Sequence, residues 1–240
     1  MKITNLIEGS FVSRPNRFTV EFRINNKKQE LAHLHDPGRL KELLIPETKI
    51  LVRYVEDYKK TNRKTKYDMI AVKNDDDWVL LNSSFHNKIV QEFIDEKKIQ
   101  KLEEYHVERA EYTYGNSRLD FLLTDKNNEK MFLEVKGCTL NIDKTAIFPD
   151  APTKRGTKHV EELIQIKQEG YESTIVILIL HNKSEEFTPN YNTDPDFSRS
   201  LEKAYHEKIN ILPVHTHTFF KNNTLTVTYD KIIDLVLKQK

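Results

Sequence analysis

Two carboxylates and a lysine lie within apolar runs near the middle of the chain. Asp120 interrupts the run LDFLL at residues 119–123, and Glu134 and Lys136 belong to the run MFLEVK at residues 131–136. Burying a charged side chain is costly, so each of these charges needs a partner, a metal ion or a catalytic role. Alternate residues of a strand share a face, which predicts that Glu134 and Lys136 point the same way.

The segment between the two runs predicts how they meet. The sequence TDKNNE at 124–129 is typical of a hairpin turn, because Asn tolerates the left-handed backbone conformation. A hairpin centred on Asn127 places Asp120 opposite Glu134, with Cβ atoms roughly 5 Å apart. Carboxylates at that spacing repel each other unless a cation lies between them, and oxygen ligands beside a lysine suit Mg²⁺ or Mn²⁺. The pattern favours a metal-dependent phosphodiesterase; the alternative is a salt bridge that caps a strand end.

Composition narrows the class of protein. A length of 240 residues predicts one or two domains, and a net charge of +1 means that any nucleic-acid binding must come from local clusters. The single cysteine, Cys138, excludes a disulfide framework and a cysteine zinc site, and it fits a reducing cytoplasm. The N-terminus lacks a signal-peptide pattern, and no apolar run is long enough to span a membrane. We therefore expect a cytoplasmic protein without a membrane partner.

The first part of the chain predicts a small β-barrel. Strands are expected at residues 18–24, 29–33, 50–55, 68–72 and 78–81, with a short helix at 38–44. Short strands with one helical turn suggest an OB-like barrel, which we assign to residues 1–82.

The pattern then changes to α/β. We expect a helix at 87–97, a strand at 104–114, the two strands of the hairpin, a helix from Thr157 to 169 and a buried strand at 173–180. This αβββαβ order, with an acid on the second strand and acid-x-Lys on the third, is that of a restriction-endonuclease-like core, assigned to residues 83–240. A helix opening at Asp194, strands at 211–214 and 224–229, and a final helix from Lys231 complete the predicted domain.

Several blocks of sequence resemble the sugar fermentation stimulation protein A (SfsA) family over nearly the whole chain. The longest are NSRLDFLL at 116–123, EVKGCTL at 134–140 and FPDAPTKRGTKH at 148–159. The resemblance implies an N-terminal OB-like domain, a C-terminal domain of the PD-(D/E)XK nuclease superfamily, and a DNA-binding protein linked to regulation of sugar metabolism. The superfamily's proline before the first acid is Leu119 here, which removes no metal ligand.

The resemblance also implies roles for individual residues. Asp120, Glu134 and the Val135 carbonyl would hold the metal ion, and Lys136 would orient or deprotonate the attacking water. Glu92 matches a position where family members carry an acid and is a further catalytic candidate; its alternative is an exposed helix residue. Many superfamily members act as dimers, which leaves a homodimer open.

Basic residues supply the nucleic-acid-binding candidates. Arg118 shares the face of Asp120, and a helix N-terminus beside basic residues favours phosphate. The segment at 57–66 holds five basic residues flanked by tyrosines, a composition suited to phosphates and bases, although a solvated loop is the alternative. The complete set of candidates is Arg17, Arg39, Lys59, Lys60, Arg63, Lys64, Arg118, Lys154, Arg155 and Lys158.

The sequence also contains two histidine pairs and allows two other functions. His33/His35 and His215/His217 each share a strand face, but two ligands do not make a zinc site, so we interpret them as edge-strand residues. A non-catalytic DNA-binding regulator that uses the nuclease fold as a platform is the main alternative function. A carbohydrate-binding module is disfavoured by the single tryptophan, Trp78, and by the basic clusters.

Overall fold

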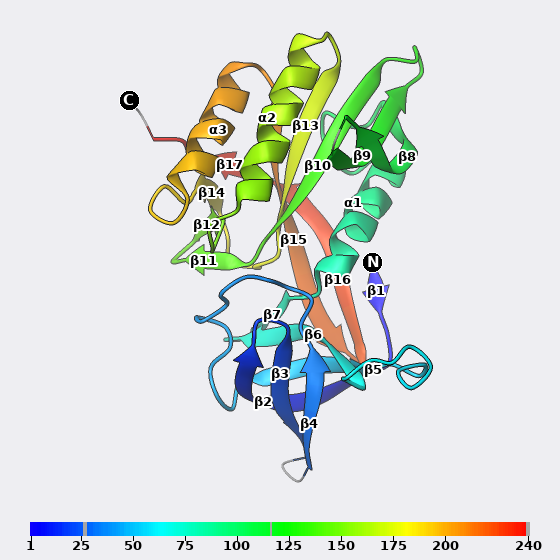
Figure 1. Ribbon diagram of the computed structural model, residues 1–240, viewed down its shortest axis with the longest axis vertical. Coiled ribbons are helices and arrows are strands. Elements are labelled where there is room, and N and C mark those ends of the chain that lie inside the picture. Colours follow the sequence, from blue (N-terminus) through cyan, green and yellow to red (C-terminus); the bar gives the residue numbers. More distant parts are fainter. Residues whose placement is uncertain (26–27, 116, 239–240) are drawn as a thin grey trace.

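The computed structural model describes residues 1–25, 28–115 and 117–238, arranged as a barrel and a larger sheet-based part along the longest axis (Figure 1). Asn116, the first residue of one family block, lies outside the described residues. No helix within those ranges combines the length and the apolarity needed to cross a bilayer.

The N-terminal part is a closed five-stranded barrel. Its strands run in the order β4-β3-β2-β5-β6, and a parallel pairing of β4 with β6 closes the sheet. They are β2 (Leu6–Asn16), β3 (Thr19–Ile24), β4 (Lys28–His33), β5 (Lys49–Tyr54) and β6 (Tyr67–Asn74). β7 (Asp77–Leu80) pairs with β6 outside the ring. Alternate residues such as Val20 and Phe22 are fully buried inside, so the predicted OB-like barrel is confirmed.

The expected short helix at residues 38–44 does not form. The segment makes a turn in which the N–H groups of Leu43 and Leu44 both donate to the Leu40 carbonyl. Leu40 has a φ of 51°, a left-handed conformation that interrupts a helix. Leu40 and Leu43 are buried, so the segment closes one side of the barrel core as an irregular loop.

The second part is built on a seven-stranded mixed sheet in the order β1-β16-β15-β13-β10-β9-β8. Its strands are β1 (Lys2–Ile3), β8 (Tyr105–Tyr114), β9 (Ser117–Asp125), β10 (Lys130–Cys138), β13 (Glu172–Ile179), β15 (Asn210–Lys221) and β16 (Thr224–Ile232). The short η1 (Ser83–Phe85) and α1 (His86–Asp95) follow the barrel, and α1 packs its apolar face on one side of the sheet. α2 (Lys154–Gln168) and α3 (Pro195–His206) cover the other side (Figure 1). The restriction-endonuclease-like order predicted for this part is confirmed.

Several boundaries differ from the prediction. α2 begins at Lys154, one turn before the predicted Thr157, because the Thr153 hydroxyl accepts the Gly156 N–H and caps the helix. The chain from Lys231 is extended rather than helical, since its backbone pairs with neighbouring strands up to β17 (Asp234–Leu235). β17 joins a small sheet that the sequence did not predict, with β11 (Leu140–Ile142), β12 (Thr145–Phe148) and β14 (Glu186–Pro189).

The first strand lies outside the barrel. β1 pairs with β16, so residues 2–3 belong to the sheet of the second part although they precede the barrel in sequence. The N-terminal domain of residues 1–82 expected from the sequence counts residues 2–3 with the barrel. In the structure these two residues pair with the sheet of the second part.

Candidate active site

The hairpin of β9 and β10 has the predicted register. Paired residues run from Lys130–Thr124 to Leu133–Phe121, which centres the hairpin on Asn127. The pairing ends there, one step before Asp120 and Glu134, and the Val135 N–H donates instead to Asp120 Oδ2 at 2.7 Å. β10 remains paired with β13 along its other edge. The two carboxylates therefore lie where one edge of β10 becomes free and a cleft opens.

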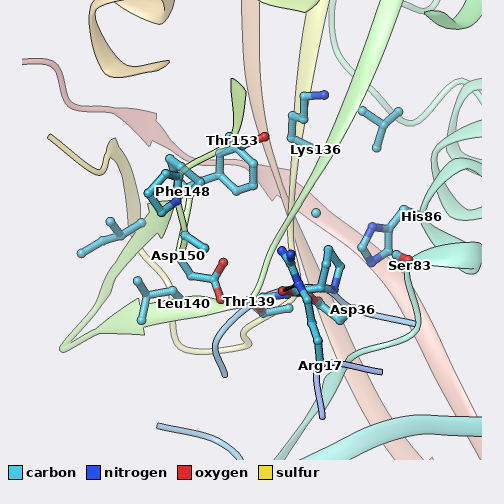
Figure 2. Close-up of a pocket in the computed structure, with 18 residues that line it drawn as sticks. Arg17, Asp36, Ser83, His86, Lys136, Thr139, Leu140, Phe148, Asp150 and Thr153 are labelled. Atoms are coloured by element: carbon cyan, nitrogen blue, oxygen red, sulfur yellow. Dashed lines mark hydrogen bonds between the residues drawn. The ribbon is translucent and has the colours of Figure 1, made fainter. Parts of the chain in front are cut away.

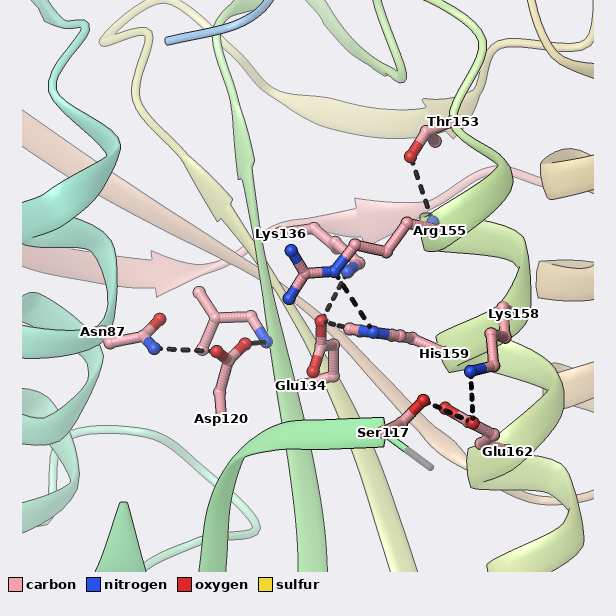
Figure 3. Close-up of polar contacts among 12 residues, drawn as sticks. Asn87, Ser117, Asp120, Glu134, Lys136, Thr153, Arg155, Lys158, His159 and Glu162 are labelled. Carbon is pink, nitrogen blue, oxygen red and sulfur yellow. Dashed lines mark hydrogen bonds and ion pairs between the residues drawn. The ribbon is translucent and has the colours of Figure 1, made fainter. Parts of the chain in front are cut away.

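Each carboxylate is held by a different helix. Asn87 on α1 donates to Asp120 Oδ1 at 2.8 Å. Glu134 Oε1 contacts Lys136 Nζ at 2.5 Å and makes a short hydrogen bond with His159 Nδ1 on α2. Figure 3 shows Asn87 approaching Asp120 from one side of β10 and His159 approaching Glu134 from the other.

The position of the proton on His159 follows from its second neighbour. Arg155 Nε, one turn earlier on α2, donates to His159 Nε2 at 3.4 Å (Figure 3). Because Nε2 is then the acceptor, Nδ1 carries the hydrogen that points at Glu134. The side chain of Glu134 is thereby fixed by two donors from α2 and β10.

The two acids have opposite pKa shifts. Burial raises the pKa of Asp120, and the nearby charge of Glu134 raises it further, against the hydrogen bonds from Val135 and Asn87. Burial also pushes the pKa of Glu134 upward, but the hydrogen bonds and charges of His159 and Lys136 outweigh burial and hold it below its usual range. Glu134 is therefore the more firmly ionised of the two acids.

The cleft has a volume of about 730 Å³ and is walled by α1 on one side and the start of α2 on the other. Asn87, Lys88 and Gln91 line it from α1. Glu92 does not: it lies on another face of α1 and pairs with the Met1 ammonium at 2.5 Å. Glu92 follows the cleft-lining Gln91, and one step along a helix turns the side chain by about 100°. The structure therefore does not place Glu92 at the site.

A second, smaller pocket of about 240 Å³ adjoins the cleft where the barrel meets the second part. Figure 2 shows Arg17 and Asp36 entering it from the barrel, and His86, Lys136 and Asp150 from the second part. Burial and the nearby charge of Asp150 raise the pKa of Asp36 to about 6, although the Gly38 N–H donates to the Asp36 carboxylate and favours its charged form.

Gly38 lies between the two carboxylates of this pocket. A Cβ at this position would lie 2.3 Å from Asp150 Oδ2 and 2.9 Å from Asp36 Oδ1, so only glycine fits. The adjacent Arg39 N–H donates to Asp150 Oδ2 at 2.7 Å, which ties the barrel loop to the second part.

Basic candidates gather around the cleft to different degrees. Arg155 lines it, and Lys154 begins the helix that forms its wall. Arg118 is 3.5 Å from Glu111, a cleft-lining residue. Lys158 points to Glu162 at 3.5 Å. Arg17 and Arg39 line a further hollow where the barrel loop meets the residues before α2, and Arg17 donates to the Pro37 carbonyl.

The basic loop of the barrel lies elsewhere. Of the described residues that line the cleft or the adjoining pocket, none comes from residues 57–66. Lys60 pairs with Asp57 at 2.8 Å, and Arg63 forms a short ion pair with Asp68. Lys59 is exposed, and Lys64 borders a shallow hollow on the barrel. The structure does not bring these four residues to the paired carboxylates.

The residues at the cleft fit a divalent metal ion. Both acids present carboxylate oxygens, the ligands preferred by hard cations. Glu134 Oε2 is buried and finds no hydrogen-bond partner among the residues that the structure describes. A buried oxygen without a donor is costly, and a bound cation removes that cost.

Sequence reasoning missed three residues here. The sequence groups His159 with the basic residues at a helix start that favours phosphate, and it gives Asn87 and His86 no role. All three come from helices far from the hairpin in sequence. Polar residues on the cleft side of α1, Asn87 and Gln91 at a spacing of four, were the one available signal.

Two family models match consecutive parts of the chain. The SfsA N-terminal OB domain matches residues 12–81, and the sugar fermentation stimulation protein RE domain matches residues 84–222.

Relatives cover nearly the whole chain. A sugar fermentation stimulation protein homolog of Methanosphaera stadtmanae is 54% identical over 240 residues, 100% of this chain and 99% of the relative. One of Methanothermobacter thermautotrophicus is 41% identical over 232 residues, 97% of this chain and 95% of the relative. The structure of Pyrococcus furiosus SfsA in complex with Ca²⁺ matches with a TM-score of 0.89 at 24% identity, covering 99% of this chain and 98% of that one. These similarities give no support to the homodimer considered from the sequence.

Proposed function

Because the chain belongs to the sugar fermentation stimulation protein (SfsA) family, we propose that it is a DNA-binding protein whose cleft is a metal-dependent phosphodiesterase site. One observation carries the proposal: Asp120 and Glu134 are brought together at the point where β9 and β10 separate, with Lys136 in contact with Glu134. This combination of two acids and a lysine at the mouth of a cleft is suited to phosphoryl transfer.

The ion would be held by Asp120 and Glu134, with the Val135 carbonyl as a predicted third ligand. The P. furiosus protein that shares this fold binds Ca²⁺, which supports a divalent-cation site. For catalysis we expect Mg²⁺ or Mn²⁺, which when bound supplies polarisation of a phosphoryl oxygen.

The chain's own residues prepare the site. Lys136 is close enough to Glu134 to hold a proton beside the reacting phosphate and to offset the negative charge that develops there. His159 fixes the Glu134 carboxylate, and Asn87 fixes that of Asp120. We therefore assign Lys136 a catalytic role and the other two residues a positioning role.

DNA is the proposed substrate because cationic side chains flank the cleft. Arg155 and Lys88 line it, and Lys154 and Arg118 lie beside it. Such side chains neutralise backbone phosphates without reading sequence. Lys59, Lys60, Arg63 and Lys64 would contact a longer duplex or strand away from the cleft.

The test is cleavage and binding of labelled single- and double-stranded DNA with Mg²⁺ or Mn²⁺. Lys136→Met should lower the cleavage rate by about 100-fold or more, the scale of a lost proton-transfer group, and Glu134→Ala, which removes a metal ligand, should lower it at least as far, while DNA binding stays within a few-fold of wild type. Glu161→Ala, an exposed glutamate on α2, serves as the matched control and should leave cleavage unchanged.

Three results separate the alternatives. Metal-dependent cutting that disappears only in the two site variants supports the nuclease. Binding without cutting in either metal favours the regulatory platform, in which the nuclease fold only holds DNA. If the protein neither binds nor cuts DNA, the nucleic-acid proposal as a whole is wrong.

A further inference from the structure

We propose that His215, His217 and Asp230 form a second metal site, of the kind that binds Zn²⁺, on the β15–β16 hairpin. One ligand atom from each of these residues lies within 4.8 Å of the others. None of the three lines the cleft or the adjoining pocket. The sequence alone offers only two ligands here, the histidine pair, and the fold supplies the third.

A β-bulge brings the third ligand into place. Thr216 pairs with Tyr229 and His215 pairs with Lys231, so Asp230 is an extra residue in β16. A bulge of this kind redirects a side chain that regular pairing would place elsewhere. It brings Asp230 to both histidines, which share one face of β15.

The hydrogen bonds of His215 leave its Nδ1 facing a carboxylate oxygen. Its Nε2 is 3.2 Å from the carbonyl oxygen of His181, which can only accept, so Nε2 carries a hydrogen. Its Nδ1 is 2.9 Å from Asp230 Oδ2. With one ring hydrogen already used, the Nδ1 lone pair and a carboxylate oxygen face each other, and either a second proton or a metal ion must lie between them.

The surroundings of His215 are those of a metal ligand. Its ring is only 2% exposed and is held in one orientation by partners at both nitrogens. A metal-bound histidine commonly donates its other ring N–H to a backbone carbonyl, as His215 does to His181.

The ligand spacing suits a tetrahedral ion. His217 Nε2 is 3.6 Å from Asp230 Oδ1, so each oxygen of the carboxylate faces one histidine. Zinc bonds of about 2.0–2.1 Å in a tetrahedron separate neighbouring ligands by about 3.3 Å. The observed 2.9 Å and 3.6 Å lie on either side of that value but end on different oxygens of Asp230, so the ion would be held by both oxygens or by one after a small rotation of the carboxylate. The side chains of His217 and Asp230 are 51% and 30% exposed, which leaves solvent access for a fourth ligand.

A second histidine pair provides an internal contrast. His33 and His35 have the same spacing, and His35 Nε2 is 3.3 Å from Asp68 Oδ1. There the Arg63 guanidinium pairs with that same oxygen, so a positive charge already occupies the position of a cation. We expect no metal binding at this second cluster.

The experiment titrates Zn²⁺ alone into the full chain by calorimetry. All variants carry Glu134→Ala, which weakens metal binding at the proposed nuclease site. His217→Ala and Asp230→Asn should each weaken one equivalent of Zn²⁺ binding by at least 10-fold, and His33→Ala should not change it. Co²⁺ in place of Zn²⁺ should give visible absorption bands that disappear in the same two variants.

Two results would overturn the proposal. The first is that the Glu134→Ala chain, with no other change, binds no equivalent of Zn²⁺ beyond any bound weakly at the nuclease site. The second is that the His217→Ala and Asp230→Asn variants both keep the Zn²⁺ affinity of that chain. Equal thermal unfolding of all variants in EDTA shows that any loss comes from missing ligands rather than misfolding. The outcome is independent of the nuclease proposal, because neither readout depends on DNA cleavage.

Discussion

Replacing Gly137 with alanine tests how closely α1 packs against β10, the strand that carries Glu134 and Lys136. Gly137 follows Lys136 on β10, and a Cβ there would lie 2.1 Å from Cε1 and 2.4 Å from Nδ1 of His86. His86, the first residue of α1, is 8% exposed and lines both the cleft and the adjoining pocket, so its ring must leave its present position to make room for the methyl group. Relief requires the His86 ring to move by more than 1 Å, through a change of its rotamer or a shift of α1 against β10, and such overpacking costs about 1–3 kcal/mol.

The cost should be visible in stability and in the cleft. For a chain of this size, 1 kcal/mol corresponds to about 2–4 °C in Tm, so Gly137→Ala should lower Tm by roughly 2–12 °C. Urea unfolding measures the same loss as a free energy. Because α1 also carries Asn87, its displacement should lower DNA cleavage in folded protein as well.

A double-mutant cycle shows whether His86 is the cause. His86→Ala alone should be destabilising because it leaves a cavity, but Gly137→Ala should add little in that background. The expected coupling is about 1–3 kcal/mol, within the range for residues in contact. If the two losses simply add, the steric account of this contact is wrong.

Two further predictions concern stability. In the folded chain the pKa of Asp36 is about 6, against an ordinary value of about 3.9, so the folded state binds more protons between these values and stability falls as pH rises through them. Asp36→Asn should therefore be more stable than wild type by about 1–3 kcal/mol at pH 8, with the gain shrinking by pH 4; an equal gain at both pH values would contradict the linkage. Thr153→Ala should cost about 1 kcal/mol in urea unfolding through the lost helix cap, and Thr157→Ala, the cap expected from the sequence, should cost clearly less. A larger loss at Thr157 would reverse the assignment of the helix start.

The central pair of acids could be predicted because it depends on simple geometry. A period of two along each strand and a turn centred on Asn127 were enough to place Asp120 beside Glu134, and the observed register agrees. The partners of those acids could not be predicted in the same way. Asn87 and His159 reach them from separate helices, and only the packing of those helices fixes which side chains meet. The misplacement of Glu92 has the same origin, since the side of α1 that faces the cleft is a tertiary property.

The errors in the fold also have physical causes. β2 escaped notice because bulges near Phe11 and Ser13 interrupt its alternation of buried and exposed residues. The residues after Lys231 have apolar spacing compatible with a helix, but β15 pairs with the end of β16, and β14 pairs with β17. Long-range pairing of this kind overrides local preference.

The position of β1 has a consequence for the order in which the chain assembles during synthesis. Lys2 pairs with Thr226 and Ile3 with Leu225, so β1 finds its partner only after more than 220 further residues are made. The barrel, whose strands all lie within residues 6–80, can form long before that. The last hairpin then captures the first strand, and the Met1 ammonium donates to the Val227 carbonyl at 2.7 Å. Completion of the sheet thus joins the two parts at both ends of the barrel segment.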